Sequence, residues 1–140
     1  TQKFNAVLLR EQGKIKYKIF KAKDKTDSYY IYIKVPSEVI SKFYYDVVIK
    51  LYTTESAKKS SAWLREYAVG FYSNDPAFVY TFAYSFRKNK LFINELASVM
   101  SKSALEEKAS IRNPDNQVWY VKSLYFAYLT SSIIIFIFLI

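Results

Sequence analysis

The chain of 140 residues contains no histidine and no cysteine, and only two glycines and three prolines. The missing residues exclude Ser-His-Asp catalysis, thiolate chemistry, disulfide bonds and Cys/His zinc sites. Two glycines are too few for a glycine-rich loop that cradles phosphate. We therefore expect a binding or structural protein, with no enzyme activity, no cofactor and no metal.

Aromatic and basic residues are abundant instead. The chain has 14 Tyr, 11 Phe and 2 Trp, and its 21 Lys and Arg outnumber 12 Asp and Glu to leave a net charge of +9. A basic surface attracts nucleic acid, anionic lipid or an acidic protein partner, and charge alone does not choose among them. The length fits a single domain over residues 1–140.

The first half of the chain, residues 1–72, is predicted to be rich in strands. From Lys14 to Phe20 the sequence alternates strictly, with Ile15, Tyr17 and Ile19 on one face and three lysines on the other, which indicates a half-buried strand. Five further segments are expected here: strands over 4–10, 29–35, 46–53 and 67–73, and a short helix over 37–44. Pro36 should end the second of these strands, and Val47, Ile49 and Leu51 should point inward.

The second half, residues 73–140, is predicted to be rich in helices. Ser73 or Asp75 can cap a helix that begins at Pro76. Further helices are expected over 91–100, after a capping box at Ser103–Glu106, and from about Asn116 with Asp115 as the cap. The sequence thus predicts an α+β fold, in which N-terminal antiparallel strands precede C-terminal helices in one domain.

The early lysines are candidate nucleic-acid-binding residues. Lysines on an exposed strand face could meet phosphates, while Phe20, Tyr29, Tyr30 and Tyr32 could stack on bases. The alternative is a solvated hairpin face whose lysines protect an edge strand from aggregation. The candidates are Lys14, Lys16, Lys18, Lys21, Lys23, Lys25 and Tyr17.

An aromatic stripe follows Pro76. Three phenylalanines recur at helical spacing, with two tyrosines opposite, and a helix that is aromatic on several faces is usually buried by neighbours. The stripe therefore suggests core packing together with an interface to other chains, so we expect an oligomer or a large assembly. The candidate interface residues are Phe78, Tyr80, Phe82, Tyr84 and Phe86.

The C-terminal segment 123–140 is 18 residues long and carries no charge. This length reaches the lower limit for a membrane span, so a tail-anchored protein with a basic cytosolic domain is one interpretation. A buried helix or a buried strand are the others. The acidic residues are scattered; Asp46, Lys50 and Glu66 could be arranged as in a metal-dependent nuclease, but their spacing is not diagnostic and predicts no catalytic site.

Three segments of the later chain resemble small structural proteins of tailed phages with AT-rich genomes: 73–81, 111–114 and 120–127. The resemblance implies a virion or assembly component, located in the virion or the host cytoplasm. The first interpretation is thus a structural subunit of a particle, with a basic face toward nucleic acid or acidic partners. A nucleic-acid-binding module and a tail-anchored membrane protein are the alternatives.

Overall fold

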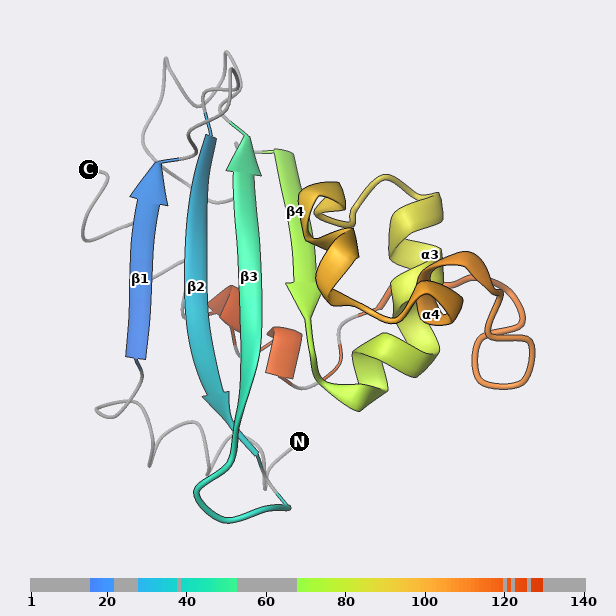
Figure 1. The fold of residues 1–140 in the computed structure, drawn as a ribbon, viewed down its shortest axis with the longest axis horizontal. Coiled ribbons are helices and arrows are strands. Elements are labelled where there is room, and N and C mark those ends of the chain that lie inside the picture. The colour runs from blue at the N-terminus through green and yellow to red at the C-terminus, as the bar shows by residue number, and fades with distance from the viewer. Residues whose placement is uncertain are drawn as a thin grey trace.

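The computed structural model describes residues 16–21, 28–37, 39–52, 68–119, 121, 123–125 and 127–129. Four strands form one antiparallel sheet in the order β1-β2-β3-β4 (Figure 1). The strands are β1 (Lys16–Lys21), β2 (Ser28–Pro36), β3 (Tyr44–Tyr52) and β4 (Ala68–Ser73). They are followed by the π-helical turn η3 (Phe78–Phe82), the helix α3 (Ala83–Lys88), the 3-10 helix η4 (Asn94–Val99) and the helix α4 (Lys102–Glu106). The predicted α+β class, with strands before helices, is confirmed.

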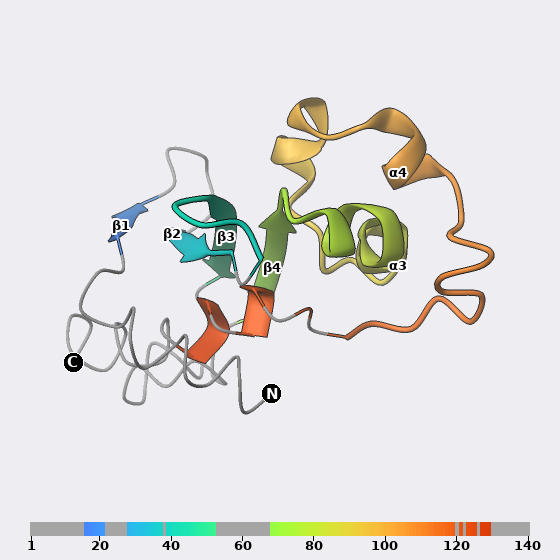
Figure 2. The ribbon, with the colours of Figure 1, turned by 90° about the horizontal axis from the view of Figure 1, so that it is seen from below.

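One face of the sheet carries the core. Its residues alternate along the central strands, with Ile31, Ile33 and Val35 on β2 and Val47, Ile49 and Leu51 on β3, and all six are buried. The predicted inward positions on β3 are therefore confirmed, and Pro36 is the last residue of β2 as expected. Figure 2 shows helical turns at 123–125 and 127–129 beside this face, where Leu124 and Ala127 are buried.

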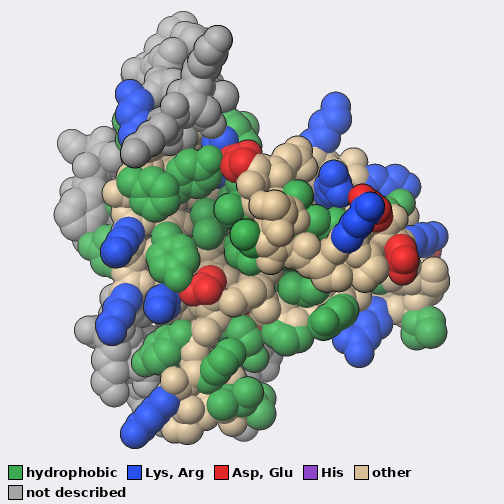
Figure 3. Space-filling view, viewed as in Figure 1, with side chains coloured by type: hydrophobic (Ala, Val, Ile, Leu, Met, Phe, Trp, Pro, Cys, Tyr) green, Lys and Arg blue, Asp and Glu red, His purple; other side chains and the backbone are tan. Residues whose placement is uncertain are grey.

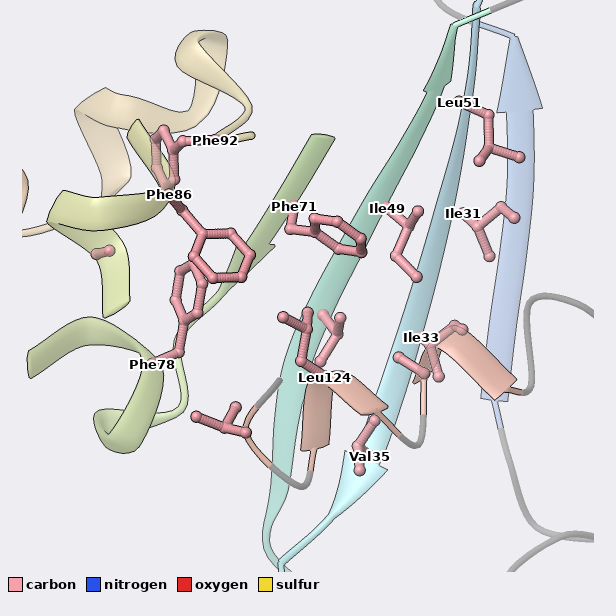
Figure 4. Close-up of a cluster of buried hydrophobic side chains, with 14 of the residues drawn as sticks. Ile31, Ile33, Val35, Ile49, Leu51, Phe71, Phe78, Phe86, Phe92 and Leu124 are labelled. Carbon is pink, nitrogen blue, oxygen red and sulfur yellow. The ribbon is translucent and has the colours of Figure 1, made fainter. Parts of the chain in front are cut away.

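Three phenylalanine rings join the sheet to the helices (Figure 4). Phe86 of α3 meets Phe71 of β4 at 5.8 Å and Phe78 of η3 at 5.1 Å between ring centroids, both edge to face. Edge-to-face contacts suit the ring quadrupoles and add to the free energy gained by burying the rings. These three residues therefore fix the position of the helices against β4.

The helical region begins where the sequence predicts. Asp75 Oδ1 accepts a hydrogen bond from the Ala77 amide at 3.0 Å, and Ser73 Oγ accepts one from the Asp75 amide at 3.1 Å. The Asp75 side chain thus satisfies an amide group that the first helical turn leaves without a backbone partner, and Ser73 binds the amide of Asp75 itself. The prediction of a helix start at Ser73–Pro76 is confirmed.

The chain reverses direction after α3. The Leu91 amide donates to the Phe86 carbonyl at 2.7 Å, the Lys90 amide donates to the Arg87 carbonyl at 3.1 Å, and Lys90 has a φ of 60°. This is the Schellman arrangement, with a lysine where glycine is usual. It directs the next residues back along β4, where the Phe71 amide donates to the Leu91 carbonyl at 2.7 Å and the Ile93 amide to the Phe71 carbonyl at 3.1 Å.

Four local predictions are corrected. The expected helix over 91–100 is wrong, because 91–93 pair with β4 and only 94–99 are helical, as the 3-10 helix η4. Residues 39–42 form bends and a turn instead of part of a helix, since Lys42 has a left-handed φ of 59°. A short helix does form at α4, but the predicted capping box is wrong, because Ser103 lies inside the helix and the cap position is Ser101, which makes no side-chain capping bond. Residues 116–119 are not helical, so Asp115 caps no helix there.

Several predictions lie wholly or partly outside the described residues. The expected strand over 4–10 is one of them, and most of the apolar segment 123–140 is another. Within the part of the chain that the structure describes, no helix combines the length and apolar character that crossing a membrane requires.

Candidate nucleic-acid interface

The second face of the sheet carries lysines among aromatic rings. Figure 1 looks onto this face and shows no described helix in front of β1, β2 and β3, and in Figure 3 basic and hydrophobic side chains alternate over the same strands. We name this surface the open face. It comprises Lys16, Lys18, Phe20, Tyr30, Tyr32, Lys34, Asp46, Val48, Lys50 and Tyr72.

The strand register orders the open face into rows that cross the sheet. One row pairs Lys18 with Tyr32, then Val48 and Tyr72. Directly opposite residues of an antiparallel pair share a face, with Cβ atoms about 4.5–5.5 Å apart. This row therefore places the exposed Lys18 within reach of the Tyr32 ring on the neighbouring strand.

The second row contains the largest exposed ring. Phe20, which is 51% exposed, lies opposite Tyr30 with 5.3 Å between the ring centroids and 31° between the ring planes. The third row places Lys16 opposite Lys34, and both are exposed. The open face thus offers exposed cations on β1 and β2 beside a pair of tilted rings.

Lys50 lies at the inner end of the Phe20–Tyr30 row. Its residue is only 2% exposed, and its Nζ lies 5.1 Å and 4.9 Å from the ring centroids of Tyr30 and Tyr52. The Glu95 carboxylate of η4 meets Nζ at 2.7 Å and also accepts the Tyr30 hydroxyl at 2.7 Å. A buried ammonium requires such partners, because losing its hydration costs several kcal/mol.

Gly70 allows η4 to approach this part of the sheet. A Cβ atom on Gly70 would lie 3.1 Å from Cγ1 of Ile93, the residue just before η4. The bare backbone of β4 thus leaves room for the buried Ile93 side chain. From there η4 extends its carboxylate to Lys50 on the neighbouring strand β3.

A second polar cluster lies nearer the opposite end of β3. The Tyr32 hydroxyl donates to Asp46 Oδ1, and Asn74 Nδ2 donates to Asp46 Oδ2 at 3.3 Å. The Asp46 amide in turn donates to Asn74 Oδ1 at 2.8 Å. The Asp46 carboxylate is therefore held by neighbours on β2 and after β4.

The tyrosine hydroxyls of the open face stay protonated at neutral pH. Burial and the hydrogen bond to Glu95 raise the pKa of Tyr30, and burial with the charge of Asp46 raises that of Tyr72. Burial opposes ionisation of Glu95, but its hydrogen bonds from Lys50 and Tyr30 outweigh this effect and lower its pKa from 4.5. The ion pair is thus fully formed above pH 4.5, and its stabilisation is lost as the pH falls through the lowered pKa.

Tyr32 should ionise late in an alkaline titration. Burial, followed by the hydrogen bond to Asp46, raises the pKa of Tyr32 from 10.0 to about 12. Its folded pKa exceeds its unfolded pKa, so the associated stabilisation is complete below pH 10 and is lost between pH 10 and 12. In a spectrophotometric titration of phenolate, we expect Tyr32→Phe to remove one tyrosine's absorbance change near pH 12.

A matched variant isolates the role of the carboxylate. Asp46→Asn removes the negative charge beside the hydroxyl and should move the ionisation of Tyr32 to lower pH. If Tyr32→Phe left the absorbance change near pH 12 untouched, the assignment of this late ionisation to Tyr32 would be wrong.

The structure divides the lysine candidates. Lys16 and Lys18 lie on the open face, whereas Tyr17 and Lys21 have the opposite alternation on β1. The strand register thus places two of these candidates on the open face and two on the opposite face of the sheet. The remaining candidates, Lys14, Lys23 and Lys25, lie outside the described residues.

The aromatic stripe after Pro76 belongs mainly to the core. Phe78 and Phe86 are fully buried, and Phe82 and Tyr84 are half-buried. The expected interface role is wrong for Phe78 and Phe86, because they already pack against the chain's own rings and offer no surface to a partner. Of the five predicted positions only Tyr80, at 58%, is exposed.

The sequence-based prediction missed Lys34, Tyr72 and Glu95. Lys34 shares its alternation with Tyr30 and Tyr32, so the sequence did contain a signal for it. Glu95 had no local signal, because its partner Lys50 lies 45 residues away along the chain. Among the described residues no three metal-binding side chains cluster, and Glu66 of the nuclease-like pattern lies outside them.

Comparison of the chain with protein-family models, curated proteins and solved structures finds no match. The open face must therefore be interpreted from its own chemistry. It can attract anions, stack on planar groups and donate hydrogen bonds from neutral hydroxyls.

Proposed function

We propose that the protein is a non-enzymatic binding module that holds single-stranded nucleic acid on the open face of its sheet. The observation that carries this proposal is that three exposed lysines, Lys16, Lys18 and Lys34, share one face of the sheet with the rings of Phe20, Tyr30 and Tyr32. Non-specific single-strand binding proteins combine a positive surface that follows the backbone with rings on which bases stack. The net charge of +9 also attracts the negatively charged strand at longer range.

The rings favour a single strand over a duplex. Phe20 and Tyr30 lie on the face of a sheet, where only an unstacked base can reach them. Lys16, Lys18 and Lys34 are exposed around them and can follow a phosphate backbone. An acidic protein would satisfy the lysines but would leave the stacking surface unused.

The salt dependence of binding to a labelled oligothymidine tests the proposal. We expect log affinity to fall linearly with log salt, with a slope of about −0.7 per contacted phosphate, and hence about −2 or steeper for the three exposed lysines. A duplex of the same length should bind more weakly. Phe20→Ala should lose about 1–3 kcal/mol of binding while keeping the slope, because it removes a stacking ring and no charge.

Fluorescence anisotropy between about 0.05 and 0.3 M salt is suitable for this measurement. A flat salt response would overturn the proposal, as would equal affinity for the single strand and the duplex. A Phe20→Ala variant with unchanged affinity would show that the rings take no part.

A role as a structural subunit of a larger assembly is a second candidate. It is favoured by the loop between β2 and β3, which exposes 90% of Val39 and 52% of Ile40 beside the exposed Phe43. The loop is held in shape, since Ser37 Oγ accepts the Val39 and Ile40 amides at 3.2 and 3.0 Å. Such an assembly, in a virion or in the host cytoplasm, would bury these side chains against neighbouring chains. Sedimentation at rising concentration would detect the association.

A further inference from the structure

The Glu95 carboxylate sits where the open face has its most buried cation. One oxygen, Oε1, accepts both Lys50 Nζ and the Tyr30 hydroxyl at 2.7 Å each. The Lys50 side chain is 3% exposed, whereas that of Glu95 is 43% exposed. The carboxylate therefore lies between solvent and a recessed ammonium group.

These two donors suit a phosphate oxygen as well as a carboxylate oxygen. Both are anionic acceptors of charge-assisted hydrogen bonds, which are shorter and stronger than neutral ones. The Tyr30 ring also contacts Phe20 at 5.3 Å, so the position directly adjoins the stacking rings. A strand whose base stacks on Phe20 would bring a phosphate near this position.

The segment that holds Glu95 is weakly anchored. The 3-10 helix η4 has no buried residue and no side-chain cap, and 3-10 hydrogen bonds have poor geometry. Its firmest contact is Ile93, which is fully buried and bonded to β4, whereas Ala97 within η4 packs against the core while only partly buried. A segment with few buried contacts can shift at low cost, so Glu95 can withdraw while Ile93 stays in place.

We propose that Lys50 and Tyr30 form a phosphate-binding position of the open face, which Glu95 occupies in the free protein and a nucleic-acid phosphate takes over on binding. This inference rests on the proposed function and adds regulation to it. Glu95 competes with the ligand, so it lowers affinity and raises selectivity for ligands that can both stack and supply a phosphate.

The variant Glu95→Gln tests the inference on the full chain. Glutamine keeps a carbonyl acceptor for Lys50 but removes the competing charge. We expect oligothymidine to bind about 5- to 10-fold more tightly with a similar salt slope, because the complexes of both chains contain the same phosphate contacts and only the competing carboxylate is removed. The matched control is Glu106→Gln, an exposed acid on α4 whose replacement changes net charge equally.

The outcomes separate this inference from the proposed function. If Glu95→Gln and Glu106→Gln raise affinity equally, the gain reflects net charge and the inference is overturned, while the proposed function stands. If neither the variants nor the natural chain bind the oligonucleotide, the proposed function fails and the inference fails with it. An increase in affinity that occurs only in Glu95→Gln supports the proposed competition between the Glu95 carboxylate and a phosphate.

A second measurement covers the case in which Glu95→Gln is unstable. Inorganic phosphate should perturb the backbone NMR signals of Tyr30 and Lys50 at lower concentration in Glu95→Gln than in the natural chain. Phosphate should also raise the melting temperature of the variant more, because a ligand stabilises the folded state to which it binds. Equal phosphate responses of variant and natural chain would contradict the proposed position.

Discussion

Replacing Lys16, Lys18 and Lys34 together by glutamine should weaken oligothymidine binding about 100-fold at 0.1 M salt. All three are exposed on the open face, and each is expected to contact one phosphate. A single-strand contact contributes a slope of about −0.7, hence about 0.7 log units at 0.1 M relative to 1 M salt. Three contacts therefore account for about two log units, and the salt slope should become about 2 units shallower.

The matched control replaces three exposed lysines on the helical side of the molecule, Lys88, Lys102 and Lys108, by glutamine. This variant has the same net charge as the first and retains the open face. We expect its affinity to fall only slightly, through the loss of long-range attraction. Equal losses in the two triple variants would mean that binding follows overall charge and that the open face is not the binding surface.

Replacing Phe86 by alanine should destabilise the fold by about 3–5 kcal/mol, the usual cost of truncating a buried phenylalanine. Phe86 is completely buried and packs edge to face against Phe71, Phe78 and Phe82. Truncation removes the apolar contact and leaves a cavity where β4 meets α3. Chemical denaturation of the two proteins measures the change in the free energy of unfolding.

Two further variants provide reference values for this loss in the free energy of unfolding. Phe86→Leu keeps most of the apolar volume and should cost clearly less than Phe86→Ala. Phe20→Ala removes a half-exposed ring from the open face and should cost much less again. A loss below about 1 kcal/mol for Phe86→Ala would show that the helices do not depend on the ring cluster.

The strands were predictable because their signal is local. On β1 and β3 each residue reveals its face by alternating with its neighbours, and an alternation of period two has one structural interpretation. The alternation on β3 by itself places Val47 inward and Lys50 on the other face. Even there burial was not predictable, since Lys50 is buried by η4 and by the rings of Tyr30 and Tyr52.

The helices after α3 were predicted less well, for a tertiary reason. Leu91 and Ile93 fit a helical pattern of apolar residues, but both bond to Phe71 at the edge of β4. An unpaired strand edge offers backbone hydrogen-bond partners that compete with those of a helix. Here residues 91–93 pair with the edge of β4 and do not form a helix. The stripe at Phe78 and Phe86 was recognised, yet spacing alone could not say whether its rings meet this chain or another.

The sequence by itself determined the order of strands and helices, the excess of positive charge and the absence of histidine and cysteine chemistry. Those properties depend on composition and on neighbours along the chain. The tertiary structure alone decided that Lys16 and Lys18 share a face with Tyr30 and Tyr32, that Phe86 is core, and that Glu95 meets Lys50. Each of these depends on strand register and on contacts between distant segments, which the folded chain alone brings together.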